Sequence, residues 1–294
     1  MKRLIITLLC ALVYGAIPAQ TLVIYDARDL FPKDAWNPPC KAVFTEDYYY
    51  SEEWLNLKDR IDTYLLYQTA KENPDWIPLA DEEFRQKIQE GKNMTPEGLR
   101  KAICRHAIGG RLYYSAEVLE NPLFARVRNK SWEEAKSNAW GVINAGGQTI
   151  VPFRYETIGS YGNIITASRK VNPDKELWEI RLYNQDGSLA SDQTYIQAFD
   201  IFNVYSQENT VCVRFSDGGW GLIDGNGRVI TNKKYDEMGT GDRIFYEKDI
   251  TDIWGKRDGK MYLVSPVSGR ETGTFTYTFR SRENHFEGVA ITWY

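Results

Sequence analysis

The chain has 294 residues, of which 43% are hydrophobic, so it is long enough for one large or two ordinary domains with a packed core. Its formal net charge is -4, which becomes -6 if a leader carrying Lys2 and Arg3 is removed, and no Lys/Arg cluster reverses this mild acidity. A nucleic acid is therefore excluded as an expected partner.

The first twenty residues have the pattern of an export signal. A basic start is followed by an apolar run over residues 4–14 and by small residues that predict cleavage after Ala19 or Gln20. The run is too short to span a bilayer, and no later stretch approaches the roughly 20 apolar residues that a membrane helix needs. We therefore predict an exported protein, periplasmic, cell-surface or extracellular, with no transmembrane segment after signal removal.

Three cysteines, Cys40, Cys104 and Cys212, remain after such a cleavage. In an oxidising compartment Cys40 and Cys104 could form a disulfide, but sequence does not reveal connectivity, and an odd count leaves at least one free thiol. The fourth cysteine, Cys10, lies inside the signal. A bacterial lipoprotein would have a small residue directly before this cysteine, and the leucine found there makes lipidation the less favoured alternative.

Residues 21–122 have mainly helical periodicity. Residues 22–24 could begin a strand, and three helices are then predicted over residues 51–73, 81–91 and 95–110. Ser51 is a plausible cap for the first helix, and Thr95 followed by Pro96 is a cap and a proline at the first helical position for the third. We expect these helices to form a small bundle.

From about Phe124 the apolar period changes from 3.6 to 2. Val211, Val213 and Phe215, for example, alternate with polar or mixed residues, as expected of strands with one buried face. Helices should be scarce beyond this point.

An internal repeat runs through this second segment. Four glycines are each followed eight residues later by a tyrosine, and successive glycines lie 40, 40 and 42 residues apart. The pairs are Gly147 and Tyr155, Gly187 and Tyr195, Gly227 and Tyr235, and Gly269 and Tyr277. Such a period indicates one supersecondary unit copied along the chain and stacked on its neighbours. The glycine that closes each turn predicts a tight β-hairpin.

Aromatic residues also recur seven residues before the glycine. Trp140, Trp220 and Tyr262 stand there, whereas the second unit has Ile180, with Trp178 two residues earlier on the same face of the strand. Rings at both ends of each hairpin would stack between units, each burying about 150 to 250 Å². We interpret these repeat positions as structural core residues and propose none of them as catalytic.

Two units carry a specific resemblance. The segments Trp140-Gly141-Val142-Ile143-Asn144 and Trp220-Gly221-Leu222-Ile223-Asp224, with the tyrosines that follow, resemble the bacterial WG-repeat family. The other two units keep only the glycine and the tyrosine. Residues 285–290 resemble the strand that opens a new unit, which predicts either an incomplete fifth unit or a closing strand.

The predicted fold is therefore α+β by segment. A small N-terminal helical domain, residues 21–122, is followed by an all-β array of antiparallel hairpins, residues 123–294, with about four units of 40 residues and a final strand. An open, solenoid-like array is favoured over a small closed propeller, because open arrays tolerate incomplete end units.

Motifs for catalysis or cofactor binding are sparse. Cys104 and His106 could supply two metal ligands, but no second pair has the spacing of a zinc site, so no metal is expected. The glycines at residues 218–227 superficially resemble a phosphate loop, yet they are flanked by strands and coincide with a repeat turn. We therefore expect no cofactor.

Two tyrosine clusters, Tyr48-Tyr49-Tyr50 and Tyr113-Tyr114, do not show the Gly-to-Tyr spacing of the repeat. Tyrosine is amphipathic, so such clusters are typical of a joint between domains, which we favour, or of a carbohydrate or peptide groove.

The resemblance to WG-repeat proteins, which are commonly envelope or secreted proteins without a settled biochemical activity, implies an interaction role. We expect an exported binding or scaffolding protein of the bacterial cell envelope whose partner is a protein or another envelope component. The alternative is an envelope hydrolase with its site in the N-terminal helical domain or at its junction with the repeats. A pocket there with several inward acidic or histidine side chains of shifted pKa would favour the hydrolase.

Overall fold

The fold is known from a computed structural model that describes residues 20–31, 37–135, 138–161, 163–172, 177–200, 210–224, 226–239, 253–280 and 285–293. The chain divides into two compact units, Met1–Phe153 and Arg154–Tyr294. Nineteen residues of the predicted export signal lie outside the described residues. The predicted domain boundary near residue 122 stays a prediction.

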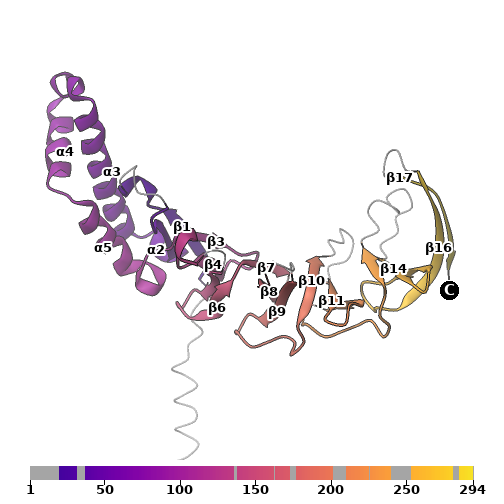
Figure 1. The fold of residues 1–294 in the computed structure, drawn as a ribbon. Helices are drawn as coiled ribbons and strands as arrows, with labels where there is room; N and C mark the ends of the chain where they lie inside the picture. The colour runs from indigo at the N-terminus through magenta and orange to yellow at the C-terminus, as the bar shows by residue number, and fades with distance from the viewer. Residues whose placement is uncertain are drawn as a thin grey trace, which may run out of the picture. The chain divides into compact units, whose positions relative to one another are not determined.

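The first unit combines helices with short strands (Figure 1). Its strands are β1 (Leu22–Asp26), β2 (Lys41–Thr45), β3 (Ser115–Val118), β4 (Phe124–Arg128), β5 (Trp140–Asn144) and β6 (Thr149–Tyr155), the last of which crosses the boundary between the units. Its α-helices are α2 (Glu46–Tyr49), α3 (Glu52–Glu72), α4 (Glu82–Lys92), α5 (Pro96–His106) and α6 (Trp132–Ala135). Short 3-10 helices are η1 (Arg28–Leu30), η2 (Pro74–Leu79) and η3 (Ile108–Gly110).

The three long helices begin where their capping residues predict. The side-chain oxygens of Ser51, Asp81 and Thr95 each accept a hydrogen bond from a backbone N–H in the first turn of α3, α4 and α5. The third helix ends at His106, earlier than predicted, because Ala107 has extended backbone angles and the chain turns into η3. The predicted helices are thus confirmed, and the predicted end of the third was wrong by about one turn.

The core of this region is shared between helices and strands. Trp54 and Ile61 of α3 and Ile103 of α5 pack in one cluster with Phe44 of β2 and Leu30 of η1. Strand β1 pairs antiparallel with β2. The expectation of a bundle of helices alone was therefore incomplete, because a β-hairpin supplies one wall of the core. We call residues 46–110, which include α2 to α5, the head.

The remaining strands form antiparallel sheets. Strands β3, β4, β5 and β6 make one sheet of the first unit. The second unit contains β7 (Thr157–Tyr161), β8 (Ile164–Asn172), β9 (Leu177–Asn184), β10 (Tyr195–Asp200), β11 (Val211–Phe215), β12 (Trp220–Ile223), β13 (Glu237–Gly239), β14 (Ile253–Arg257), β15 (Lys260–Val264), β16 (Glu271–Arg280) and β17 (His285–Trp293).

In the second unit, β7 to β12 follow one another in a six-stranded sheet, and β13 to β17 do so in a five-stranded sheet. Among the described residues no sheet closes into a barrel, and the α+β fold with an array of antiparallel β-repeats is confirmed. Strand β17 pairs with β16 at the edge of its sheet. The chain end thus continues the array, as an incomplete fifth unit would.

Each repeat has four strand positions, which we name A to D. The strand at position A comes directly after the repeat tyrosine of the preceding repeat. The strands at positions B and C form a hairpin. The turn closed by the repeat glycine joins position C to position D, and position D leads to the tyrosine of its own repeat. The first repeat is β3 to β6, and the second is β7 to β9 with residues 189–195. The third is β10 to β12 with residues 229–235, and the fourth is β13 to β16.

Candidate functional site

The repeat tyrosines lie at the D-to-A corners, and those whose side chains are described are buried. Tyr155, Tyr195 and Tyr235 are 1%, 0% and 1% exposed. Their hydroxyls are paired: Tyr155 shares a 2.6 Å hydrogen bond with Tyr183, and Tyr195 donates to Ser191 Oγ at 3.0 Å. Tyr235 donates to a carboxylate oxygen at 3.2 Å. A buried ring with a satisfied hydroxyl is a packing residue, so these positions build the array.

The tyrosines also join consecutive repeats. Tyr195 ends the second repeat and packs with Val211 and Val213 of the third. Tyr235 ends the third repeat and packs with Ile253 and Val264 of the fourth. Equivalent residues therefore have equivalent surroundings in these two copies, as stacking of repeats requires.

The glycines that close the turns all have left-handed backbone angles. The φ values of Gly147, Gly187, Gly227 and Gly269 are 77°, 87°, 80° and 65°. In the first three turns the glycine N–H bonds to the residue three positions back, whereas Gly269 bonds to Ser265, four positions back. The fourth turn is thus one residue longer than the others.

This longer turn changes which residue occupies the tryptophan position. Trp220 pairs with Tyr235 and Ile180 with Tyr195, so Ile180 takes that position in the second repeat. In the fourth repeat Met261 stands four residues before the start of the turn, as Trp220 does, but it pairs with Phe275 and not with Tyr277. Tyr262 comes one residue later.

The remaining predicted residues have these places in the structure. Trp140 is a half-buried residue at the start of β5. Tyr277 lies within β16 opposite Val289 of β17.

The head is inserted into a further repeat. Lys41 and Tyr113 exchange backbone hydrogen bonds of 2.9 and 2.8 Å, the pattern that Trp220 and Tyr235 make at 2.8 and 3.0 Å. The backbone N–H of Tyr114 donates to the backbone oxygen of Arg128 in the following repeat. Asp236, which follows Tyr235, donates in the same way to the backbone oxygen of Lys256. Strands β1 and β2 and residues 111–113 therefore occupy positions B, C and D of a repeat that precedes the first, and the head replaces its turn.

Tyr113 is the repeat tyrosine of this preceding copy. It is 1% exposed and packs with Val43 of β2 and with Val127 and Ile143 of the first repeat. Sequence reasoning missed it because no glycine stands eight residues before it. The sequence did contain one signal. Tyr113 lies 42 residues before Tyr155, and the same distance separates Tyr235 from Tyr277.

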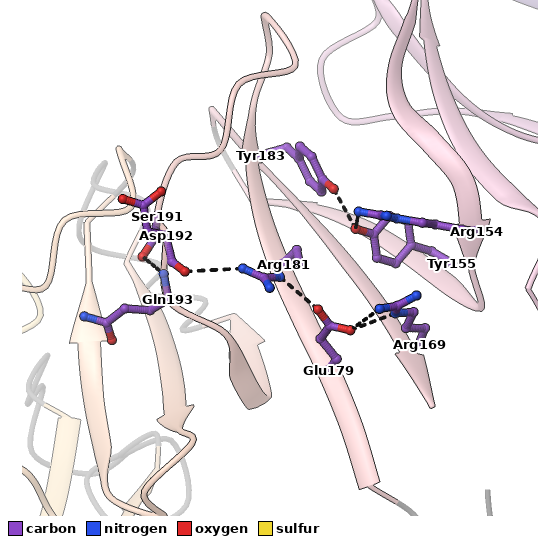
Figure 2. Close-up of polar contacts among 9 residues, drawn as sticks. All are labelled: Arg154, Tyr155, Arg169, Glu179, Arg181, Tyr183, Ser191, Asp192 and Gln193. Carbon is purple, nitrogen blue, oxygen red and sulfur yellow. Dashed lines mark hydrogen bonds and ion pairs between the residues drawn. The ribbon is translucent and has the colours of Figure 1, made fainter. Parts of the chain in front are cut away.

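Polar clusters tie neighbouring strands of the second unit together (Figure 2). Glu179 of β9 accepts hydrogen bonds from Arg169 of β8 at 2.7 Å and from Arg181 at 2.9 Å. Arg181 also donates to the backbone oxygen of Asp192 at 3.3 Å. Partial burial opposes ionisation of Glu179, but the two arginines outweigh it and lower its pKa. A carboxylate that two arginines keep ionised is suited to holding neighbouring strands together. It is less suited to proton transfer, because its pKa lies further from neutral pH.

A second cluster repeats this design around Glu271 of β16. Its carboxylate accepts from Arg257 of β14 at 2.6 Å, from Lys233 at 3.0 Å and from the Tyr235 hydroxyl. Partial burial again opposes ionisation, and Arg257 and Lys233 outweigh it, so the pKa of Glu271 is lowered. Burial and the nearby carboxylate raise the pKa of Tyr235.

The first unit contains a hollow of about 1090 Å³ between η1 and α3. Its described lining includes the carboxylates Asp29 and Glu72 together with Tyr64, but no histidine. His106 lies elsewhere, 3.2 Å from Glu53 and stacked on Tyr48. No specific observation favours the hydrolase, which stays an untested alternative.

Cys40 and Cys104 are free thiols in the structure. Cys40 is buried and Cys104 partly buried, and burial raises the pKa of each. The disulfide between them stays a prediction. Within the described ranges, no group of three or more His, Cys, Asp or Glu side chains is placed to hold a metal ion. Likewise, none of the helices in that part of the chain is long and apolar enough to cross a bilayer.

The fold and these buried positions define a β-repeat protein with an inserted helical head. The sequence profile of the family described as "WG containing repeat" matches residues 140–163 and 220–242. Each match begins at position C of the first or third repeat and includes the strand at position A of the next repeat. These two matches support the resemblance of the first and third repeats to WG-repeat proteins. Comparison with curated proteins gives no match.

Proposed function

We propose that this protein is an exported binding or scaffolding protein of the bacterial cell envelope, in which the repeats present the head to a protein or another envelope component. The observation that carries this proposal is the insertion of the head between Lys41 and Tyr113. The chain segments that enter and leave the head are joined by the backbone hydrogen bonds between Lys41 and Tyr113. Tyr113 also packs in the apolar cluster with Val43 and Val127. A segment attached at two adjacent points is presented in a more defined orientation than one on a single flexible linker.

Binding can be tested by replacing the head. Residues 45–112 lie between Phe44 and Tyr113, the strand positions that Tyr183 and Tyr195 occupy in the second repeat. Residues 184–194 can therefore replace them, and we call this protein the turn-replacement variant. Chemical crosslinking in native cells should capture a partner with the full chain and lose it with the variant. Equal capture by both proteins would contradict presentation of the head.

Export can be tested independently of binding. The small residues before Thr21 support cleavage, so the mature protein isolated from cells should begin at Gln20 or Thr21. N-terminal sequencing of the envelope and cytosolic fractions measures this directly. An intact Met1 on cytosolic protein would contradict export without affecting the binding experiment.

A further inference from the structure

The connection between α3 and α4 exposes three large apolar side chains. Trp76, Ile77 and Leu79 of η2 are 50%, 38% and 85% exposed. In Figure 1 this connection is the end of the helical hairpin farthest from the strands of its own unit. We call residues 72–83 the tip. Single exposed apolar residues are common, but three within four positions at the end of a projection are typical of a contact surface.

The tip also carries an unbalanced charge. It contains Glu72, Asp75, Asp81, Glu82 and Glu83 but no lysine or arginine. These five side chains are exposed. Asp81 caps α4, and the two glutamates after it complement the dipole of that helix. Asp75 likewise lies in the first turn of η2, so only Glu72, in the last turn of α3 next to Lys71, stands where the helix dipole does not favour an acid.

The combination of apolar and acidic side chains selects the kind of partner. An anionic membrane surface attracts basic segments and repels acidic ones, so it opposes insertion of this tip. A protein pocket that is apolar at its centre and bordered by lysine or arginine side chains complements both features. We infer that the tip docks Trp76, Ile77 and Leu79 into such a pocket on a partner protein. This inference rests on the proposed function, because it names the part of the head that binds.

The test uses the full chain with a photo-crosslinking amino acid in place of Leu79. Leu55, on the same hairpin near the start of α3, is 57% exposed and provides the matched control position. Crosslinking in native cells should join Leu79, but not Leu55, to one protein. That protein is then purified and titrated with the variants. Leu79→Ser and Trp76→Ala should each weaken binding about tenfold or more, and Leu55→Ser should leave it unchanged.

The contribution of the acidic side chains to binding can be measured separately. Asp75→Lys should weaken binding of the same purified protein, and added salt should weaken binding of the wild type more than that of Asp75→Lys. Melting temperatures should be unchanged in all these variants because the altered side chains are exposed, and this measurement separates docking from folding.

Several outcomes would overturn the inference. The crosslinker at Leu79 could react no more strongly than at Leu55, or could form an adduct with a lipid. The protein could bind phosphatidylglycerol vesicles more tightly than phosphatidylcholine vesicles. The Leu79→Ser variant could bind the captured protein with wild-type affinity. If a partner is lost from the turn-replacement variant but bound normally by Leu79→Ser, the proposed function stands and the tip is excluded. If the full chain captures no partner, both proposals fail.

Discussion

At the scale of single residues, the glycine after the tryptophan makes room for ring packing. A Cβ at Gly221 would lie 2.6 Å from Thr231 Oγ1 and 2.8 Å from the ring of Phe215. A Cβ at Gly141 would lie 2.8 Å from the ring of Phe153. The Trp-Gly pair therefore has a steric reason that is separate from turn formation.

Gly221→Ala should lower the free energy of unfolding by about 1 to 3 kcal/mol, because the added methyl group overpacks a buried contact. Chemical denaturation measures the change. Gly146→Ala is the control, since its Cβ would be no closer than 3.4 Å to its nearest neighbour and should change stability by less than about 0.5 kcal/mol. Equal midpoints for the two variants would contradict the steric account.

The buried ring of Tyr235 should contribute more to the free energy of unfolding than the half-buried ring of Trp220 or the exposed ring of Tyr50. Tyr235→Ala should cost about 3 to 5 kcal/mol, as expected when a buried aromatic side chain leaves a cavity. Trp220→Ala should cost less, because Trp220 is only half-buried. Thermal melting of both variants checks this, with Tyr50→Ala, at a residue that is 69% exposed, as the control. An unchanged melting curve for Tyr235→Ala would show that the ring is not core.

At the scale of elements, local signals determined the helices well. The caps at Ser51, Asp81 and Thr95 are predictable because they need only residues within one turn. Strand pairing was less predictable, as the shift from Tyr262 to Met261 shows. One extra residue in the turn changes the offset between the glycine and the strand before it, and the glycine spacing alone does not record this change.

The carboxylate cluster that joins β14 to β16 predicts a pH dependence. The pKa of Glu271 is lowered in the folded protein, so its contribution to stability is present above its ordinary pKa of about 4.3 and is lost as the pH falls through the lowered value. Glu271→Gln should reduce the free energy of unfolding at pH 7 by about 1 to 3 kcal/mol. It should also flatten the loss of stability between about pH 5 and pH 3.

Denaturant titrations at several pH values measure this effect. Glu237→Gln is the matched control, because Glu237 pairs with Lys256 at 3.0 Å while both side chains are more than one-third exposed. Such a surface pair contributes little, so this variant should follow the wild-type curve. If Glu271→Gln keeps the wild-type slope under acid conditions, the cluster does not stabilise the fold as argued.

At the scale of the whole molecule, the head belongs to a repeat that begins before it and ends after it. Truncation before residue 114 would keep the whole first repeat but would remove Leu22, Val43 and Tyr113 from the cluster that covers Val127 and Ile143. The turn-replacement variant keeps the strand positions of this repeat. It should carry Phe44→Ser as well, because that ring packs against the helices of the head.

This variant should therefore melt at a higher temperature than the chain 114–294, which lacks the same helices but keeps the whole first repeat. Circular dichroism and thermal melting of the two proteins measure the difference. If the chain 114–294 is equally stable, the strands before the head are dispensable and do not act as a repeat.

The sequence by itself determined the turn glycines, the helix caps and the resemblance of two WG segments, because each of these depends on residues close together in the chain. It also determined the period, because the same short Gly-to-Tyr spacing recurs along the chain. Only the tertiary structure decided that Lys41 pairs with Tyr113 and that the head interrupts a repeat. The physical reason is that strands pair through backbone groups that every residue shares. Residues 72 positions apart can therefore form a repeat hairpin without a shared side-chain pattern.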